Sequence, residues 1–313
     1  MLYSPRSMDT QMDTCCRAAS HAALPVFLLV VAGCACSSTS EPPTPPNVSP
    51  LSRIELADQD VRGISGLGRA PDGTLWAVGE RDHVLLALSA TDGRTLSRRA
   101  IDGVDGSVDL ESLAWLGNSR IAVGTERGAE GRQTDAIYFI DVGAMDARVA
   151  NSVELRYELW GIVPRGNQGI EGLCYADSIL LAGVESPSER DGKRVAAIGR
   201  YDMERAAWTP LWLQLTSDTG KLSALDCRGN GDHLDVLAVE RHFEVARVLR
   251  FSVPRTGDPG VIAPTNVLDL APHKSDNDNF EGIVWVGDGS AALIVDNDSG
   301  SISAPNSLFL TSF

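Results

Sequence analysis

The chain has 313 residues, with 27 Lys and Arg against 42 Asp and Glu, and a formal net charge of −15. This acidic excess argues against a nucleic-acid-binding surface, because phosphates are bound by clusters of Lys and Arg. It favours divalent cations as partners. The 43% hydrophobic and 22% charged residues are typical of a folded protein, and 30 glycines with 16 prolines favour sheet and turns over helix.

Residues 1–33 are predicted to be the signal peptide of a bacterial lipoprotein. A basic start with Arg6 and Arg17 precedes a short apolar run over 23–32, which is about half the roughly twenty residues that a membrane-spanning helix needs. The run ends in Val31-Ala32-Gly33-Cys34, which resembles the lipobox, whose cysteine becomes the lipidated first residue. Cys34 is therefore the predicted lipidation site and membrane anchor. An ordinary signal peptide with an unmodified cysteine is the alternative.

Residues 34–50 are rich in Ser, Thr and Pro and have no apolar period, which is typical of a flexible tether. Ala35, rather than an aspartate, follows Cys34, and in lipoproteins this favours transport to the outer membrane where the host has one. The predicted location is the bacterial cell envelope, with residues 51–313 forming the folded domain.

That domain contains one sequence pattern five times. Each copy has a Ser or Glu within a short apolar segment, and 14 to 17 residues later an apolar run ends in Glu or Asp. The first positions are spaced 46, 60, 52 and 58 residues apart. They are Ser65, Glu111, Glu171, Ser223 and Glu281, and the second positions are Glu80, Glu126, Glu185, Glu240 and Asp296.

Each copy contains four short β-rich runs separated by turn residues. The third copy shows them as GLCYA, ILLAGVE, VAAIGRYD and WTPLWLQL. No stretch keeps a 3.6-residue period, so little helix is expected. Four-stranded units repeated about every fifty residues are typical of a β-propeller.

The ends of the domain predict how the ring closes. The fifth copy stops one strand short, and an unassigned strand, Ser52–Ala57, precedes the first copy. The predicted fold is therefore all-β, a single five-bladed propeller of four-stranded blades closed by an N-terminal strand. Six blades is the alternative, although the 46-residue interval has no room for a hidden unit.

The repeated acidic residues are the candidate site. The first strand of a propeller blade lines the central channel, so these carboxylates converge and repel one another unless a cation neutralises them. Calcium suits such a set because it takes six to eight oxygen ligands. The predicted metal ligands are Glu111, Glu171, Glu281 and Asp296, with Glu80, Glu126, Glu185, Glu240 and Asn297 as further candidates at the channel mouth. An arginine follows directly in Glu80-Arg81, Glu126-Arg127 and Glu240-Arg241. The structural alternative is that these three glutamates are paired between blades or accept backbone N–H bonds.

At these residues the chain resembles the phytase-like family described as having esterase-like activity of phytase. The resemblance is carried by Asn279–Gly282, by Asp296-Asn297, and by the E-G-L and V-E-S segments at 171–173 and 184–186. It covers about residues 55–313 and implies a propeller fold, export and calcium-assisted hydrolysis of phosphate or carboxylic esters. Calcium phytases also use a cluster of basic residues to bind phosphates. Here Lys193, Lys221 and Lys274 are the only lysines, and the sequence shows no basic cluster.

Two classes of function are therefore predicted. The first is a metal-dependent hydrolase acting on a small-molecule ester, with one carboxylate left as general base. The second is a non-catalytic propeller that binds a ligand or protein of the envelope. The fold alone does not choose between them, because propellers host both.

Cys174 and Cys227 are a candidate disulfide. They lie in the first strands of adjacent copies, three residues after Glu171 and four after Ser223. Since side chains alternate between faces, this one-residue offset points them to opposite faces of neighbouring blades, and an oxidising envelope would preserve the bridge. Two separate buried thiols are the alternative.

Overall fold

The computed structural model describes residues 51–57, 59–275, 278–296 and 305–313. The chain divides into two units, Met1–Pro46 and Asn47–Phe313, and all described residues belong to the second. The predicted signal peptide, lipidation site Cys34 and tether lie outside the described residues, as does Asn297. Within the described part, no helix has the length and apolar character needed to cross a bilayer.

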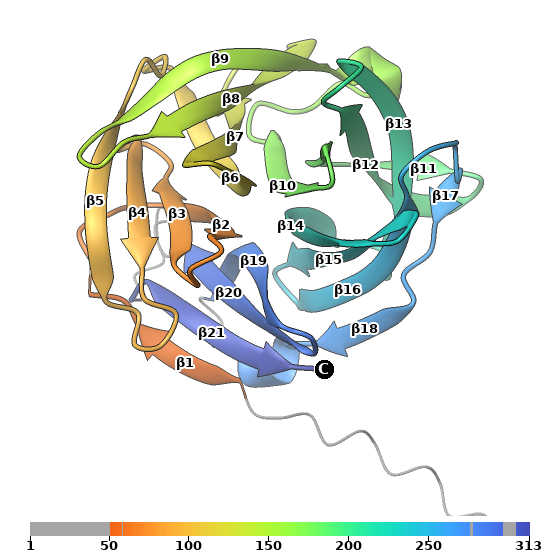
Figure 1. The fold of residues 1–313 in the computed structure, drawn as a ribbon. Helices are drawn as coiled ribbons and strands as arrows, with labels where there is room; N and C mark the ends of the chain where they lie inside the picture. Colours follow the sequence, from red (N-terminus) through yellow and green to blue (C-terminus); the bar gives the residue numbers. More distant parts are fainter. Residues whose placement is uncertain (1–50, 58, 276–277, 297–304) are drawn as a thin grey trace, which may run out of the picture. The chain divides into compact units, whose positions relative to one another are not determined.

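Four-stranded antiparallel units follow one another around a ring (Figure 1). The innermost strands are β2 (Ile64–Arg69), β6 (Val108–Gly117), β10 (Ile170–Ala176), β14 (Lys221–Asn230) and β19 (Asn279–Gly287). The second strands are β3 (Leu75–Gly79), β7 (Arg120–Arg127), β11 (Ile179–Arg190), β15 (His233–His242) and β20 (Ser290–Asp296). The third strands are β4 (Val84–Leu88), β8 (Thr134–Val142), β12 (Lys193–Asp202), β16 (Val245–Pro254) and β21 (Ser307–Ser312). The outermost strands are β5 (Thr95–Asp102), β9 (Ala147–Arg156), β13 (Ala207–Gln214), β18 (Asn266–Asp269) and β1 (Ser52–Glu55).

The N-terminal strand completes the last unit. Strand β1 pairs antiparallel with β21, with Ser52 opposite Leu310 and Glu55 opposite Ser307. This is the pairing that the missing strand in the sequence predicts. It joins the two ends of the domain through backbone hydrogen bonds.

Smaller elements link neighbouring units. A short parallel pair between β5 and β9 joins the first two units into one eight-stranded sheet, and β17 (Val261–Ile262) pairs parallel with β13. Among the described residues the only helical segments are two 3₁₀ turns, η1 (Tyr157–Leu159) and η2 (Ala271–His273). The predictions of an all-β fold and of little helix are confirmed.

The burial of each strand reflects its place in the unit. Every residue of β3 and β4 is buried, because neighbouring units cover both faces of these strands. The outermost strand β5 instead alternates between exposed and half-buried residues along most of its length. Continuous apolar runs such as LLAGV in β11 are therefore inner strands, and alternating runs are outer strands.

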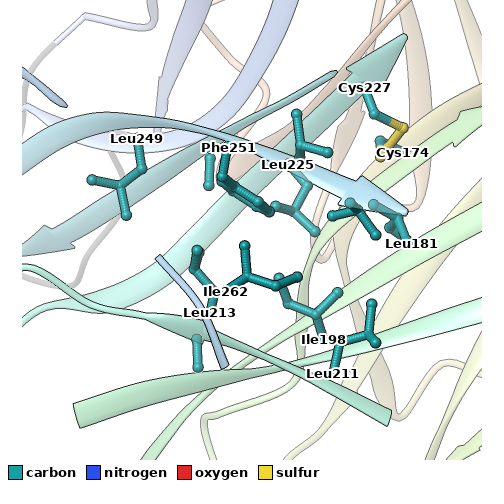
Figure 2. Close-up of a cluster of buried hydrophobic side chains, with 14 of the residues drawn as sticks. Cys174, Leu181, Ile198, Leu211, Leu213, Leu225, Cys227, Leu249, Phe251 and Ile262 are labelled. Carbon is teal, nitrogen blue, oxygen red and sulfur yellow. A yellow bond between two sulfur atoms is a disulfide. The ribbon is translucent and has the colours of Figure 1, made fainter. Parts of the chain in front are cut away.

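The hydrophobic core consists of clusters between adjacent units. In the cluster between the third and fourth units, Leu181, Ile198 and Leu211 face Leu249 and Phe251 of the next unit (Figure 2). Further clusters of the same kind lie between the other neighbouring units. The ring therefore has no single centre of packing, and its stability depends on every interface between units.

The predicted disulfide between Cys174 and Cys227 is confirmed. It joins β10 to β14 at the edge of the cluster in Figure 2, with a Cα–Cα distance of 5.4 Å. The bridge therefore links the innermost strands of two adjacent units covalently, in addition to the side-chain packing of this interface.

We expect removal of this bridge to destabilise the domain by about 4 kcal/mol, because it closes a loop of 53 residues in the unfolded chain. The Cys174→Ala/Cys227→Ala double variant should melt at a lower temperature than wild type. Reductant should lower the melting temperature of wild type and leave the double variant unchanged. Equal effects of reductant on both proteins would contradict this assignment.

Candidate functional site

The repeated acidic residues of the inner strands lie at β-bulges. Between β6 and β7, Leu110 pairs with Thr125 and Ser112 pairs with Gly124, so Glu111 has no partner of its own. The same register shift leaves Glu171 extra in β10 and Glu281 extra in β19. Since a bulge bends the strand and re-aims the side chain, the bulges direct these carboxylates into the centre of the ring.

Where the first repeat position is a serine, its hydroxyl joins adjacent units. Ser65 Oγ donates to the backbone oxygen of Glu111 at 2.6 Å, and Ser223 Oγ donates to the backbone oxygen of Phe280 at 2.8 Å. These two positions are therefore structural. The first-position carboxylates that could bind a ligand or a metal are those of the other three units, Glu111, Glu171 and Glu281.

A cavity of about 400 Å³ opens at this end of the ring. Of the predicted site residues that the structure describes, six line this cavity: Glu80, Glu111, Glu126, Glu171, Glu185 and Glu281. Glu240 and Asp296 do not line it. Its acidic lining consists of Glu80, Asp109, Glu111, Glu126, Glu171, Glu185, Asp278 and Glu281. Its basic lining consists of Arg81, Lys221, Arg241, His242 and Lys274.

One side of the cavity is neutralised by ion pairs. Arg241 Nε lies 3.2 Å from Glu281 Oε2, and Arg241 Nη2 lies 3.7 Å from Glu185 Oε1. Lys221 Nζ lies 3.3 Å from Glu185 Oε1. Burial would lower the pKa of Arg241, but the carboxylates of Glu281 and Glu185 outweigh it and raise that pKa. An arginine thus pairs carboxylates from different units, but these are Glu281 and Glu185 rather than the glutamates next to an arginine for which the sequence suggested such pairing.

Glu240 is turned away into a loop contact. Its carboxylate accepts the backbone N–H groups of Thr216 and Ser217 at 3.0–3.1 Å, and also their hydroxyl groups. The sequence had offered backbone N–H bonds as the alternative for this kind of residue. Glu240 therefore fixes a loop.

The other side of the cavity carries carboxylates without such partners. Glu111, Glu126 and Glu171 are 7%, 8% and 4% exposed, and no hydrogen bond or ion pair to their carboxylates is found among the described residues. Burial, followed by repulsion from neighbouring glutamates, raises the pKa of Glu111 and of Glu171 well above the ordinary value. Burial is also the main cause that raises the pKa of Glu126 to about 8 and that of Glu80 to about 9.

Three of these carboxylates form a compact group. One oxygen each from Asp109, Glu111 and Glu126 lie within 4.8 Å of one another. Asp109 and Glu111 are two residues apart on β6, and Asp109 pairs directly with Glu126 across β7. Asp109 is not among the ligands predicted from the sequence. Its position two residues before Glu111 in a strand could have indicated that both side chains lie on one face.

The remaining predicted ligands are placed as follows. Glu171 lines the same cavity outside the compact group, and the carboxylate of Glu281 is held by Arg241 and by Asn279 Nδ2 at 2.7 Å. Asp296 ends β20, opposite Asn279. The roles of Glu171, Glu281 and Asp296 as metal ligands stay predictions.

The Asp- and Asn-rich segment before β19 is described only in part, because residues 276–277 lie outside the described residues. Within it, Asp278 Oδ2 accepts the backbone N–H of Ser275 at 2.8 Å, and Asp278 Oδ1 lies 3.4 Å from Arg53 of β1. Asp278 thus links the cavity rim to the strand that closes the ring.

In chelator we expect the free energy of unfolding to fall as pH rises from about 5 to about 9. The folded-state pKa values of Glu126 and Glu80 lie above the value of about 4.3 of a free glutamate. The folded protein therefore binds more protons in this window. The stability that these two glutamates contribute is fully present below the pKa of the unfolded chain. It is lost as the pH rises through about 8 for Glu126 and about 9 for Glu80.

Chemical denaturation at a series of pH values measures this dependence. Glu80→Gln and Glu126→Gln should each flatten it, because glutamine mimics the neutral carboxyl group. Glu189→Gln, at an exposed position on β11, is the matched control and should keep the wild-type slope. The same slope in all four proteins would contradict the assignment.

Comparisons with known proteins agree with this architecture. No curated protein matches the chain in sequence. Among solved structures, the PQQ-bound aldose sugar dehydrogenase of Streptomyces coelicolor is similar, with 13% identity, a TM-score of 0.52 and coverage of 85% of this chain and 99% of that one. Two other similar structures are glutaminyl cyclase of Myxococcus xanthus (17% identity, TM-score 0.47, coverage 84% and 95%) and virginiamycin B lyase of Staphylococcus aureus (10%, 0.43, 84% and 99%).

At these identities the aldose sugar dehydrogenase shows only the fold, which is a β-propeller. The sequence evidence is more specific. The profile of the phytase-like family, described as "esterase-like activity of phytase", matches residues 38–299. The bulged glutamates at 171 and 281 and the cavity that they line lie inside the matched region. The chain therefore belongs to the phytase-like family.

Proposed function

We propose that this protein is a lipid-anchored, calcium-dependent hydrolase of phosphate or carboxylic esters in the bacterial cell envelope. The observation that carries the proposal is the group of Asp109, Glu111 and Glu126, whose negative charge no described residue offsets by an ion pair. Three carboxylates so close together, two of them buried and one half-buried, repel one another, and a divalent cation removes that repulsion.

The donor set fits calcium. Calcium binds carboxylate oxygens at about 2.3–2.6 Å, so two oxygens on opposite sides of one ion lie about 5 Å apart. The oxygens of Asp109, Glu111 and Glu126 lie within 4.8 Å of one another. The group has no nitrogen or sulfur donor, which disfavours zinc. These three residues would hold the ion, with Glu171 as the nearest further candidate ligand.

The remaining lining residues supply the other parts of a hydrolytic site. A bound calcium ion polarises an ester or phosphoryl oxygen and lowers the pKa of a water molecule. Glu171 is buried in the same cavity, and burial raises its pKa. It would act as the general base once the positive charge of the bound ion has lowered that pKa. Lys274 lines the cavity as well and would orient an anionic substrate. Lys221 and Arg241 also line it, but they already pair with Glu185 and Glu281 and add little positive charge for a substrate. Both classes of ester therefore stay in the proposal.

We also propose that the ring has five blades. Each innermost strand, from β2 to β19, begins one antiparallel unit, and β1 supplies the outer strand of the last unit. Reading each unit as one blade accounts for the strands described, apart from β17. Three of these blades contribute their first-position glutamate to the cavity, which is why the acids gather there.

The second candidate is a non-catalytic binding propeller of the envelope. The ion pairs of Arg241 with Glu281 and Glu185 favour it, because they neutralise part of the ring without a metal. In that case the compact group would hold a structural ion or none, and the cavity would bind a ligand without transforming it.

Calcium should stabilise the protein by about 2.7 kcal/mol at a hundredfold excess over its dissociation constant. Asp109→Asn and Glu111→Gln should keep the fold and lose most of this response, because each removes a charged ligand. Melting curves with calcium and with chelator measure it. Glu189→Gln is the control for a carboxylate on the surface, and hydrolysis of p-nitrophenyl phosphate and p-nitrophenyl acetate is followed in the same buffers.

The outcomes separate the candidates. Calcium-dependent hydrolysis that Glu111→Gln abolishes supports the hydrolase. A calcium shift without hydrolysis of either ester supports the binding propeller. No calcium shift in wild type contradicts the metal site. Glu281→Gln should destabilise the protein with or without calcium, because it leaves Arg241 without its main partner.

The lipid anchor is tested separately. Fatty-acid labelling in a bacterial host should mark the wild-type protein and leave Cys34→Ala unlabelled, because Cys34 is the lipobox cysteine. Both proteins should melt at the same temperature after release from the membrane, since the described domain begins at residue 51. Equal labelling of the two proteins would contradict the anchor.

A further inference from the structure

A second cavity, of about 230 Å³, lies at the opposite end of the ring. The acidic cavity is lined by early residues of the inner strands, such as Glu171 in β10 and Glu281 in β19. The second cavity is lined by later residues of the same strands, including Tyr175 in β10 and Trp285 in β19. Because the chain rises about 3.3 Å per residue, four residues separate the two levels by roughly 13 Å.

An apolar neck separates the two cavities. In each inner strand, the residue two positions after the first repeat position is a leucine or an isoleucine. The side chain of each is at most 2% exposed. The space between these side chains is too narrow for a water molecule. The neck residues are Leu67, Leu113, Leu173, Leu225 and Ile283. The second cavity is therefore not a continuation of the acidic one.

Aromatic side chains form the walls of this cavity. Trp115, Tyr175 and Trp285 line it, while Trp76 stacks on Trp115 from outside with ring centroids 5.7 Å apart. The indole Nε1 atoms of Trp115 and Trp285 are buried and have no hydrogen-bond partner, and Trp285 is only 7% exposed. Because these two N–H groups are buried, the indole rings present carbon atoms rather than hydrogen-bond donors to the cavity.

The polar groups of the cavity include both donors and acceptors. Arg69 is exposed, and no hydrogen bond or ion pair of its guanidinium is found among the described residues. The carboxyl group of Asp226 lines the cavity and accepts the backbone N–H of Trp285 at 2.7 Å. Tyr175 adds a hydroxyl group, which both donates and accepts. Arg228, by contrast, is held by Asp235 at 3.1 Å and lies over Trp285.

We propose that this second cavity binds a single sugar ring. The C–H face of a pyranose packs against aromatic side chains, while its hydroxyl groups need donors and acceptors side by side, as Arg69, Asp226 and Tyr175 provide. The cavity volume matches one ring. The site does not involve the acidic cavity, so it is independent of the hydrolase.

Other small ligands fit less well. A quaternary ammonium group would meet the guanidinium groups of Arg69 and Arg228, and a simple anion would meet Asp226. An amino acid would bring its ammonium group close to the guanidinium groups of Arg69 and Arg228, and its carboxylate close to the carboxyl group of Asp226. A hydroxyl group bonds to either the ionised or the protonated form of that carboxyl group.

The test is saturation-transfer NMR and tryptophan fluorescence titration of the folded domain with D-glucose, D-galactose and N-acetyl-D-glucosamine. We expect at least one sugar to bind and to change the tryptophan emission, because Trp115 and Trp285 line the cavity. Arg69→Ala should weaken binding about tenfold, and Tyr175→Phe should weaken it several-fold, because each loses hydrogen bonds to the ligand. Arg62→Ala is the matched control, since Arg62 is an exposed arginine just before the same strand, β2.

Chelator and the Glu111→Gln variant should leave sugar binding unchanged, which separates this site from the calcium proposal. The inference is overturned if none of the three sugars binds or if Arg69→Ala and Tyr175→Phe bind as wild type does. Loss of sugar binding in Glu111→Gln would place the sugar in the acidic cavity and overturn it as well. So would tighter binding of choline or glycine, which serve as the cationic and zwitterionic probes.

Discussion

The convergence of like charges on one axis is the constraint that organises this molecule. A repeat that places an acid at an equivalent position in successive units must bring those acids together when the ring closes. Burial makes their mutual repulsion stronger, because the dielectric constant is lower than in water. This repulsion is relieved differently on the two sides of the acidic cavity. Arg241 and Lys221 neutralise Glu281 and Glu185, whereas Asp109, Glu111 and Glu126 are left as a group.

Each of the three consecutive residues of the repeat in the inner strands has its own structural role. The acid is the extra residue of a bulge and points into the cavity. The next residue is glycine in three units because the inner strands approach closely. A Cβ on Gly66 would lie 2.5 Å from the backbone nitrogen of Leu113, and one on Gly282 would lie 2.9 Å from the backbone carbon of Gly66. The third residue is the leucine or isoleucine of the neck. Three consecutive residues thus make the cavity, the strand contact and the barrier beneath it.

Much of the fold follows from local sequence patterns. The apolar runs predicted the strands, the unpaired strand at Ser52–Ala57 predicted the pairing of β1 with β21, and the alternation of faces predicted the disulfide between Cys174 and Cys227. These features depend on side-chain periodicity and on the count of strands, and both are visible in one sequence.

The candidate site was predictable only in outline. The acidic cavity follows from the repeat, but the partner of each acid depends on neighbouring units. Glu240 and Glu185 occupy the same repeat position, and yet one caps a loop and the other pairs with Lys221. Lys221 and Arg241 lie apart in the sequence and meet as cross-strand partners on β14 and β15, so no linear cluster reveals them. Asp109 was missed because it lies outside the repeat.

The aromatic cavity does have a signal in the sequence. Trp115, Tyr175 and Trp285 each stand four residues after the first-position glutamate of their unit. The repeat that predicts the acidic cavity therefore also places aromatic residues at the other end of the inner strands.

The neck makes the two ends of the ring chemically independent. At roughly 13 Å, the Coulomb interaction between two charges is about three times weaker than at 4 Å in the same medium. The polar groups at the aromatic end are also of both signs, since Arg69 and Arg228 face Asp226. They therefore contribute little net field to the acidic end. The surplus charge of Asp109, Glu111 and Glu126 must be balanced within its own cavity, by protons or by a cation. Because the raised pKa of Glu126 reports the proton as the balancing charge when no metal is present, a cation that binds this group has to displace protons, and its affinity must rise with pH.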